Sequence, residues 1–230
     1  MARKRVVVLI SGRGSNMAAL IDAAGDPNYP VEIVGVISDR AEAKGLNAAA
    51  ALGIEAVSIT RADHPDKASL DAALDAELKR MRADIVCLAG YMRLLTPGFT
   101  ETWAGRLINI HPSLLPLFKG LDTHARAIES GMRVHGCSVH FVTAEMDGGP
   151  IIAQAAVPIL PGDDSDRLAA RVLAVEHQLY PLALRLVATG KARMENGRAI
   201  LSGVSAEGAL LSPGAATDEL DIESLARMTP

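Results

Sequence analysis

Short apolar runs alternate with longer amphipathic stretches up to about residue 130. The runs are rich in Val, Ile and Leu, as expected for strands buried on both faces of a sheet. Between them, apolar residues recur every three or four positions, the spacing of a helix that packs one face. Alternating strands and helices with short connections predict right-handed βαβ units and a parallel sheet. The predicted strands are residues 4–10, 31–38, 55–60, 84–89 and 106–110, and the predicted helices are residues 15–24, 41–52 and 66–81.

The pattern changes from residue 134. Residues 134–143 and 151–157 are predicted strands, separated by the turn-forming Met146-Asp147-Gly148-Gly149-Pro150. Residues 164–189 predict one long helix in which Pro181 can introduce a kink, and residues 191–202 predict a small hairpin around Asn196-Gly197. The predicted fold class is α/β: a Rossmann-like, mostly parallel sheet with helices on both faces and a small C-terminal hairpin. We expect one domain, residues 1–203, followed by a loosely ordered tail, residues 204–230.

Composition limits the class of function. The 230 residues are 49% apolar and 22% charged, which excludes a disordered chain. No apolar run approaches the roughly 18 residues of a membrane span, and the apolar residues 6–10 are too few for a secretory signal. The net charge of −4 offers no basic field for nucleic acid, and two cysteines exclude a disulfide framework or a four-cysteine zinc site. We therefore expect a cytoplasmic protein that acts on small molecules, without a membrane or nucleic-acid partner.

A glycine-containing loop follows the first predicted strand. In Ser11-Gly12-Arg13-Gly14-Ser15-Asn16 the glycines permit a tight turn, and the N–H groups of the following helix, with the side chains of Ser15 and Asn16, are expected to face outward and bind an anion. A dinucleotide fingerprint would need a third glycine where Met17 stands, and the Lys-Ser/Thr of a Walker loop is absent. The loop predicts a single phosphate. Asp39, after the second strand, keeps a nicotinamide-dependent oxidoreductase as an alternative, and a glycine turn needed only for packing is another.

Polar residues end the fifth predicted strand. Asn109 and His111 are two residues apart and so project from the same face, toward the crevice where open α/β sheets bind ligands. An amide beside an imidazole can donate hydrogen bonds to an oxyanion that develops during acyl transfer. Asp147, in the later turn, is a candidate to orient and charge the histidine. A structural role for His111 stays open, while metal ligation by His111, His124 and His140 matches no standard spacing.

These segments resemble the phosphoribosylglycinamide formyltransferases, folate-dependent enzymes of purine biosynthesis, from about residue 5 to residue 201. The Asn-x-His and the distant Asp are typical of folate formyltransferases in general. The Ser-Gly-x-Gly-Ser-Asn and His-Gly-x-Ser-Val-His segments are typical of this particular family. The resemblance is carried by residues 8–16, 88–95, 109–116 and 135–142, and by Asp147-Gly148-Gly149-Pro150.

The resemblance implies the formyltransferase fold and transfer of a formyl group from 10-formyltetrahydrofolate to the amine of glycinamide ribonucleotide. It implies no metal and is compatible with a monomer or a homodimer. The residues it implies are Asn109, His111 and Asp147 for catalysis; Gly14, Ser15, Asn16 and Glu176 for the ribotide; and Lys67, Met92, Arg93, Leu94, Leu95 and Asn109, with the segment 141–147, for the folate.

One segment departs from the family pattern. After Pro116 the family has a basic residue and then Pro-Gly-Leu-His-Thr-His, whereas this chain has Leu117-Phe118-Lys119-Gly120-Leu121-Asp122-Thr123-His124. Lys119 stands at a different position from the family's basic residue, and Asp122 replaces a family residue. These differences concern the expected substrate contacts and not the expected chemistry.

Other functions remain as alternatives. A methionyl-tRNA formyltransferase would add a basic C-terminal domain, and a formyltetrahydrofolate deformylase would add an N-terminal regulatory domain. A ligand-binding module without catalysis would leave Asn109, His111 and Asp147 unexplained.

Overall fold

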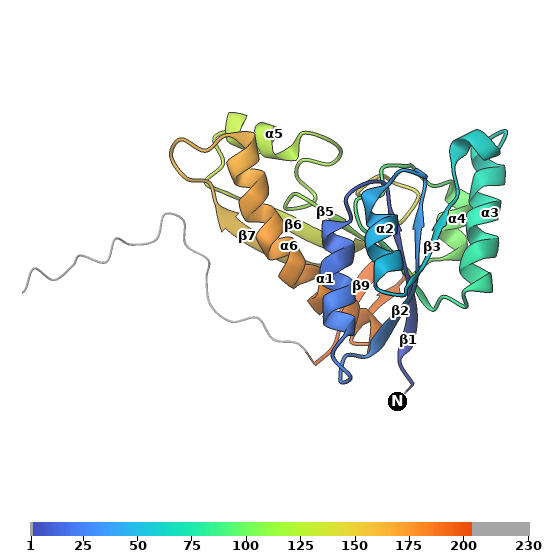
Figure 1. Cartoon of the computed structure of the whole chain (residues 1–230). Helices are drawn as coiled ribbons and strands as arrows, with labels where there is room; N and C mark the ends of the chain where they lie inside the picture. Colours follow the sequence, from blue (N-terminus) through green and yellow to red (C-terminus); the bar gives the residue numbers. More distant parts are fainter. Residues whose placement is uncertain (1, 204–230) are drawn as a thin grey trace, which may run out of the picture.

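A seven-stranded sheet forms the centre of the computed structural model, which describes residues 2–203 (Figure 1). The strand order is β3-β2-β1-β4-β5-β6-β7. Strands β1 to β5 run parallel, whereas β6 is antiparallel to both β5 and β7. A separate hairpin pairs β8 with β9. The strands are β1 (Lys4–Ile10), β2 (Val31–Ser38), β3 (Glu55–Ser58), β4 (Ile85–Leu88), β5 (Leu107–His111), β6 (Val134–Phe141), β7 (Ile151–Pro158), β8 (Ala192–Glu195) and β9 (Arg198–Leu201).

Helices cover both faces of the sheet because alternate residues of its strands are buried in opposite directions. Val6 and Val8 of β1 pack in a core with α1 (Ser15–Ala24), α2 (Lys44–Ala51) and α6 (Ser165–Ala188). Their neighbours Val7 and Leu9 pack with α3 (Lys67–Arg80) and α4 (Pro97–Thr102) on the other face. Figure 1 shows α3 and α4 on the side of the sheet away from α1 and α6. The predicted α/β class, with its mostly parallel sheet, is confirmed.

Local capping explains where the predicted helices begin. Asp66 accepts a hydrogen bond from the backbone N–H of Ser69 (2.7 Å) and completes a capping box at the start of α3. Asp164 accepts one from Arg167 (2.8 Å) at the start of α6. Helix α6 continues through Pro181, as the prediction of one long helix requires.

The structure corrects several element boundaries. Helix α2 begins at Lys44 rather than at residue 41, because a turn in which Ala43 N–H donates to Arg40 O (3.2 Å) precedes it. The 3₁₀ turn η1 (Arg61–Asp63) and the helices α4 and α5 (Thr123–Glu129) were not predicted. All three are shorter than the ten or so residues over which a helical period becomes recognisable. In α4, the cap Thr96 followed by proline at the first position is the local signal.

Two further predictions concern the C-terminal tail and membrane crossing. The predicted tail, residues 204–230, lies outside the described residues, so the proposed division at residue 203 stays a prediction. Within residues 2–203, none of the helices combines the length and apolar character needed to cross a membrane.

Candidate active site

Strands β5 and β6 place an amide against an imidazole. Asn109 and His140 are directly opposite in the antiparallel register, and Asn109 Nδ2 lies 3.2 Å from His140 Nε2. His140 Nδ1 lies 2.9 Å from the carbonyl oxygen of Phe141, which only accepts, so Nδ1 carries the proton and Nε2 accepts from Asn109. Burial lowers the pKa of His140, which keeps the ring neutral. His140 therefore fixes the orientation of the Asn109 amide.

Asp147 reaches the same site from the loop between β6 and β7. Its Oδ2 lies 3.4 Å from His111 Nδ1 and accepts from the N–H of Gly120 (2.9 Å). The other ring nitrogen of His111, Nε2, lies 3.0 Å from the carbonyl oxygen of Phe118. Both ring nitrogens thus face oxygen atoms that accept hydrogen bonds, and Asp147 provides a carboxylate beside the buried ring. The other oxygen of Asp147, Oδ1, lies 3.8 Å from Nε2 of His140, the partner of Asn109.

The glycines after Asp147 let the loop return closely to the sheet. A Cβ atom at position 149 would lie 1.8 Å from the carbonyl oxygen of Phe141, so only glycine fits there. Asp147 itself has a left-handed backbone with φ of 49°. A non-glycine residue in this region is uncommon, and such conformations cluster at functional sites.

A buried hydroxyl anchors the chain that follows His111. Ser138 lies opposite His111 across β5 and β6, and its Oγ accepts from Leu115 N–H (3.0 Å) and from Gln154 Nε2 (2.8 Å). The same hydroxyl donates to the carbonyl oxygen of Ser113 (2.7 Å). Three elements are thereby tied together beneath the site. The sequence alone gives no signal for this role of Ser138, because only the pairing of β5 with β6 reveals its position.

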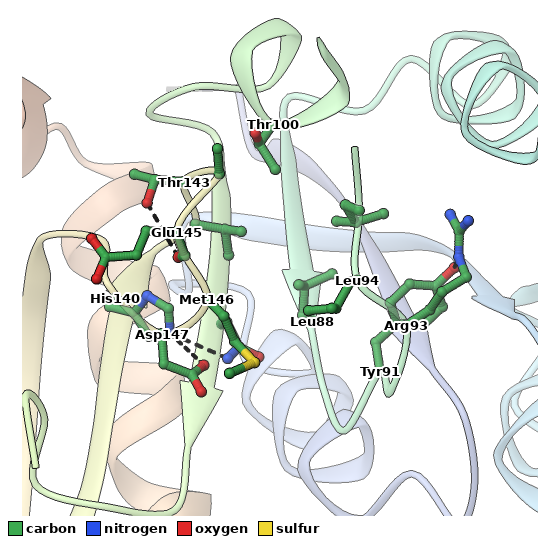
Figure 2. Close-up of a pocket in the computed structure, with 14 residues that line it drawn as sticks. Leu88, Tyr91, Arg93, Leu94, Thr100, His140, Thr143, Glu145, Met146 and Asp147 are labelled. Carbon is green, nitrogen blue, oxygen red and sulfur yellow. Dashed lines mark hydrogen bonds and ion pairs between the residues drawn. The ribbon is translucent and has the colours of Figure 1, made fainter. Parts of the chain in front are cut away.

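Two walls enclose a cleft beside Asn109, which we call the strand-end cleft (Figure 2). One wall comes from the end of β4 and the segment after it, and the other from the end of β6 and the loop that carries Asp147. Leu94 and Met146, one on each wall, are 57% and 51% exposed. Exposed apolar side chains next to convergent polar groups are typical of a small-molecule site. The cleft is lined by Leu88, Tyr91, Arg93, Leu94, Leu95, Thr100, Asn109, His140, Val142, Thr143, Ala144, Glu145, Met146 and Asp147.

Asp71 on α3 holds one wall of this cleft. Its carboxylate pairs with the guanidinium of Arg93 and accepts from Thr96 N–H (2.7 Å). Arg93 also donates to the hydroxyl of Tyr91 (3.2 Å). Lys67, the other residue expected here, is exposed at the start of α3 and is not among the residues that line the cleft.

The glycine loop forms a second cleft, the glycine-loop cleft. Gly14 has φ of 77°, and its carbonyl oxygen begins α1 by accepting from Ala18 N–H (2.9 Å). Ser11 Oγ accepts from Met92 N–H (2.8 Å), so the loop is fixed to the segment after β4. Met92 lines this cleft rather than the strand-end cleft. The lining residues are Ser11, Gly12, Arg13, Gly14, Ser15, Asn16, Arg40, Ala89, Gly90 and Met92.

The side chain of Asn16 is buried, whereas the sequence predicted that it faces outward. Its Nδ2 donates to Glu176 Oε2 (2.7 Å), and the residue is only 9% exposed. Asn16 Oδ1 is buried with no hydrogen-bond partner among the described residues. Burial raises the pKa of Glu176, and the hydrogen bond from Asn16 opposes that rise. The predicted ribotide residues Asn16 and Glu176 are thus in direct contact.

The segment of residues 89–95 borders both clefts: residues 89, 90 and 92 line the glycine-loop cleft, and residues 91 and 93–95 line the strand-end cleft. Ligands bound in the two clefts would therefore meet near the ends of β1, β4 and β5, where open α/β sheets bind ligands. Within residues 2–203, no three His, Cys, Asp or Glu residues are grouped so that they could hold a metal ion.

Comparisons with known proteins identify the family. A family model described as formyl transferase matches residues 4–184. The chain belongs to the formyl transferase family. This formyl transferase is 45% identical over 198 residues to a phosphoribosylglycinamide formyltransferase of Escherichia coli, covering 86% of this chain and 93% of the relative. A crystal structure of phosphoribosylglycinamide formyltransferase from Brucella melitensis is 56% identical, with a TM-score of 0.79 over 82% of this chain and 97% of that one. The resemblance inferred from the sequence is confirmed.

Longer relatives also match. The chain is 47% identical over 197 residues to the trifunctional purine biosynthetic protein adenosine-3 of Bos taurus, and the match covers 85% of this chain. It spans only 20% of that relative's length.

Proposed function

We propose that this formyl transferase moves the formyl group of 10-formyltetrahydrofolate to the amine of glycinamide ribonucleotide. The amine nitrogen attacks the formyl carbon, and the carbonyl oxygen becomes negatively charged. The bond between the formyl carbon and the folate nitrogen then breaks as that nitrogen gains a proton and the attacking amine loses one. The products are formylglycinamide ribonucleotide and tetrahydrofolate, and no metal ion or redox step is needed.

The two clefts border each other along residues 89–95, Asn109 and Asp147 line the strand-end cleft, and His111 contacts Asp147; this arrangement carries the proposal. The strand-end cleft would hold the folate, with Arg93, Leu94 and Leu95 in one wall. Lys67 at the start of α3 and Met92 at the border of the clefts remain predicted folate contacts. The glycine-loop cleft would hold the ribotide through the backbone of Gly14 and Ser15 and through the pair of Asn16 and Glu176.

Each residue of the catalytic group has a separate role that follows from its contacts. The amide of Asn109, oriented by His140, donates to the formyl oxygen as charge develops on it. His111, held between Phe118 O and Asp147, moves protons between the amine, the intermediate and the folate nitrogen, directly or through water. Asp147 stabilises the charged ring while that transfer takes place.

The direct test is incubation of the purified chain with both substrates while tetrahydrofolate is measured. Release that depends on glycinamide ribonucleotide and yields formylglycinamide ribonucleotide supports the proposal. Release at the same rate without the ribotide would instead identify a hydrolase that transfers the formyl group to water. If no tetrahydrofolate is released with or without the ribotide, both the transferase and the hydrolase assignments are overturned.

A further inference from the structure

Two arginine side chains line the glycine-loop cleft without a partner of their own. Arg13 belongs to the loop itself and Arg40 follows β2, and both are exposed. Within residues 2–203, neither guanidinium makes a hydrogen bond or an ion pair. Some arginines elsewhere, such as Arg5, Arg80 and Arg171, each pair with a carboxylate, whereas others, such as Arg61, lack a partner among the described residues but line neither cleft. The cleft therefore contains positive charge that the protein leaves unneutralised.

The fold brings Arg40 to the loop through a close contact of α2. Gly45 N–H donates to Gly12 O (3.0 Å), which docks the first turn of α2 on the glycine loop. A Cβ atom at position 45 would lie 2.4 Å from Ile10 Cδ1 and 3.2 Å from Gly12 O, so the approach depends on glycine. Ser38 Oγ accepts from the N–H of Arg40 (3.0 Å) and fixes the backbone there. Residues distant in sequence are thus held on one rim.

A second observation points independently to a ligand in this cleft. Asn16 is nine-tenths buried, and its Oδ1 accepts no hydrogen bond from the described residues. A buried acceptor without a donor costs free energy unless a ligand supplies one. Hydroxyl or amine groups would satisfy Asn16 Oδ1, and an anion would satisfy the two arginines. A sugar phosphate carries both kinds of group.

We propose that Arg13 and Arg40 form a clamp for a phosphate monoester in its dianionic form and give this cleft its preference for phosphorylated substrates. This deepens, and rests on, the proposed assignment of the cleft to the ribotide. The N-terminus of α1 contributes only partial charges. The net charge of −4 repels an incoming dianion over longer distances. Two full positive charges at the rim offset this repulsion, and guanidinium groups can each bind phosphate oxygens with two hydrogen bonds.

Ribose 5-phosphate is the probe that tests the clamp, because it contains the phosphate and the sugar without the reacting amine. Its dissociation constant would be measured calorimetrically for the wild type, Arg13→Gln, Arg40→Gln and the double variant. Each single change is expected to weaken binding about tenfold, and the double change about a hundredfold, since each removes one unit charge close to a dianion. Weak binding of ribose should not change. Arg13→Lys and Arg40→Lys keep the positive charge but lose the paired N–H groups of the guanidinium. They should retain part of the affinity.

Arg61→Gln is the matched control, because Arg61 is exposed in η1 and lines neither cleft. Thermal unfolding of every variant separates lost binding from lost folding. The clamp is overturned if the double variant binds ribose 5-phosphate as the wild type does, if Arg61→Gln weakens binding equally, or if the wild type does not prefer ribose 5-phosphate over ribose. Binding without any formyl transfer would leave the clamp standing and refute the proposed reaction instead.

Discussion

The two clefts of this protein are built in different ways. The glycine-loop cleft comes mainly from one contiguous segment, residues 11–16, whose backbone turns sharply into the start of α1. The strand-end cleft combines side chains from β5, β6 and the loops around them, and the amide of Asn109 depends on His140 for its orientation. The backbone shapes the first cleft, with a few side chains such as Arg13 and Asn16 in its lining, whereas a network of side chains forms the second.

This difference follows from where each cleft lies in the sheet. The glycine loop joins β1 to α1 within the parallel half, where a strand leads directly into a helix that binds anions at its N-terminus. The strand-end cleft lies where the parallel half meets the antiparallel β6. There, cross-strand neighbours such as Asn109 and His140 come from distant parts of the sequence. Substitutions should therefore affect binding in the first cleft and turnover in the second.

Asn109→Ala should have the largest effect, and it should fall on turnover. The amide is proposed to act on charge that develops only in the transition state, so kcat should fall roughly 10²–10³-fold with a small change in either KM. Steady-state kinetics with both substrates measures this. Asn47→Ala on the exposed surface of α2 is the control. A nearly normal kcat would remove Asn109 from the mechanism.

Gly14→Ala should affect binding instead. At φ of 77° a side chain is strained, and its Cβ would lie 3.0 Å from Met17 Cε and 3.3 Å from Gly45 Cα. The displaced loop should raise the KM for the ribotide between about tenfold and a hundredfold, and leave the KM for the folate nearly unchanged.

Gly53→Ala controls for the backbone strain, because Gly53 has φ of 74° with open space around it and lies far along the chain from the loop. Both variants should lose thermal stability, Gly14→Ala more because of its additional close contacts, but only Gly14→Ala should change the ribotide KM. Equal increases in both KM values for Gly14→Ala would contradict the idea of a local phosphate cradle.

The same contrast explains how much of the molecule could be predicted from its sequence. The strand of residues 4–10 and the helix of residues 15–24 match the structure because each has a clear apolar period and the loop between them is a local signal. Asn109 and His111 could be found because alternation along one strand puts them on one face.

Residues that depend on tertiary pairing could not be found in this way. His140 was assigned no role in catalysis, although it lies in a segment typical of the family, because its contact with Asn109 requires the antiparallel register of β5 and β6. Asn16 was expected to face outward, because the carboxylate that turns it inward, Glu176, is 160 residues away. Gly45 gave no signal of its own, since its role is to let α2 approach the loop.

His140→Phe should sharpen the description of the strand-end cleft as a network. The ring volume is largely kept, but the acceptor for Asn109 Nδ2 is lost, so kcat should fall roughly tenfold, the scale of coupling within one hydrogen-bond network. Because His140 acts through Asn109, the double variant His140→Phe, Asn109→Ala should be no slower than Asn109→Ala alone. Losses that simply multiply would mean that His140 acts on the substrate by itself.

Glu176→Gln should give the smallest change in activity and an opposite change in stability. A glutamine keeps an acceptor for Asn16 Nδ2, and its NH₂ group can donate to the unpartnered Asn16 Oδ1. The variant also removes a charge whose burial raises the pKa of Glu176 above its ordinary value of 4.5. We expect Tm at neutral pH to rise by a few degrees, at about 2–4 °C per kcal/mol for a chain of this size, while the KM for the ribotide increases severalfold.

The pH dependence gives the sign of this effect. A carboxyl with a raised pKa binds more protons in the folded than in the unfolded state, so it destabilises the folded protein at pH values above that pKa. As the pH falls through the raised pKa, the carboxyl becomes protonated in the folded state, and this cost fades until the unfolded state also becomes protonated below 4.5. The stability advantage of Glu176→Gln should therefore be largest at neutral pH and shrink on acidification to the part due to the new hydrogen bond. Thermal unfolding from pH 4.5 to pH 7.5 measures it, with Glu101→Gln on the exposed face of α4 as the control. An advantage that does not change with pH, or a lower Tm at neutral pH, would mean that the carboxylate of Glu176 stabilises the glycine-loop cleft, which would then depend on a side-chain pair as the strand-end cleft does.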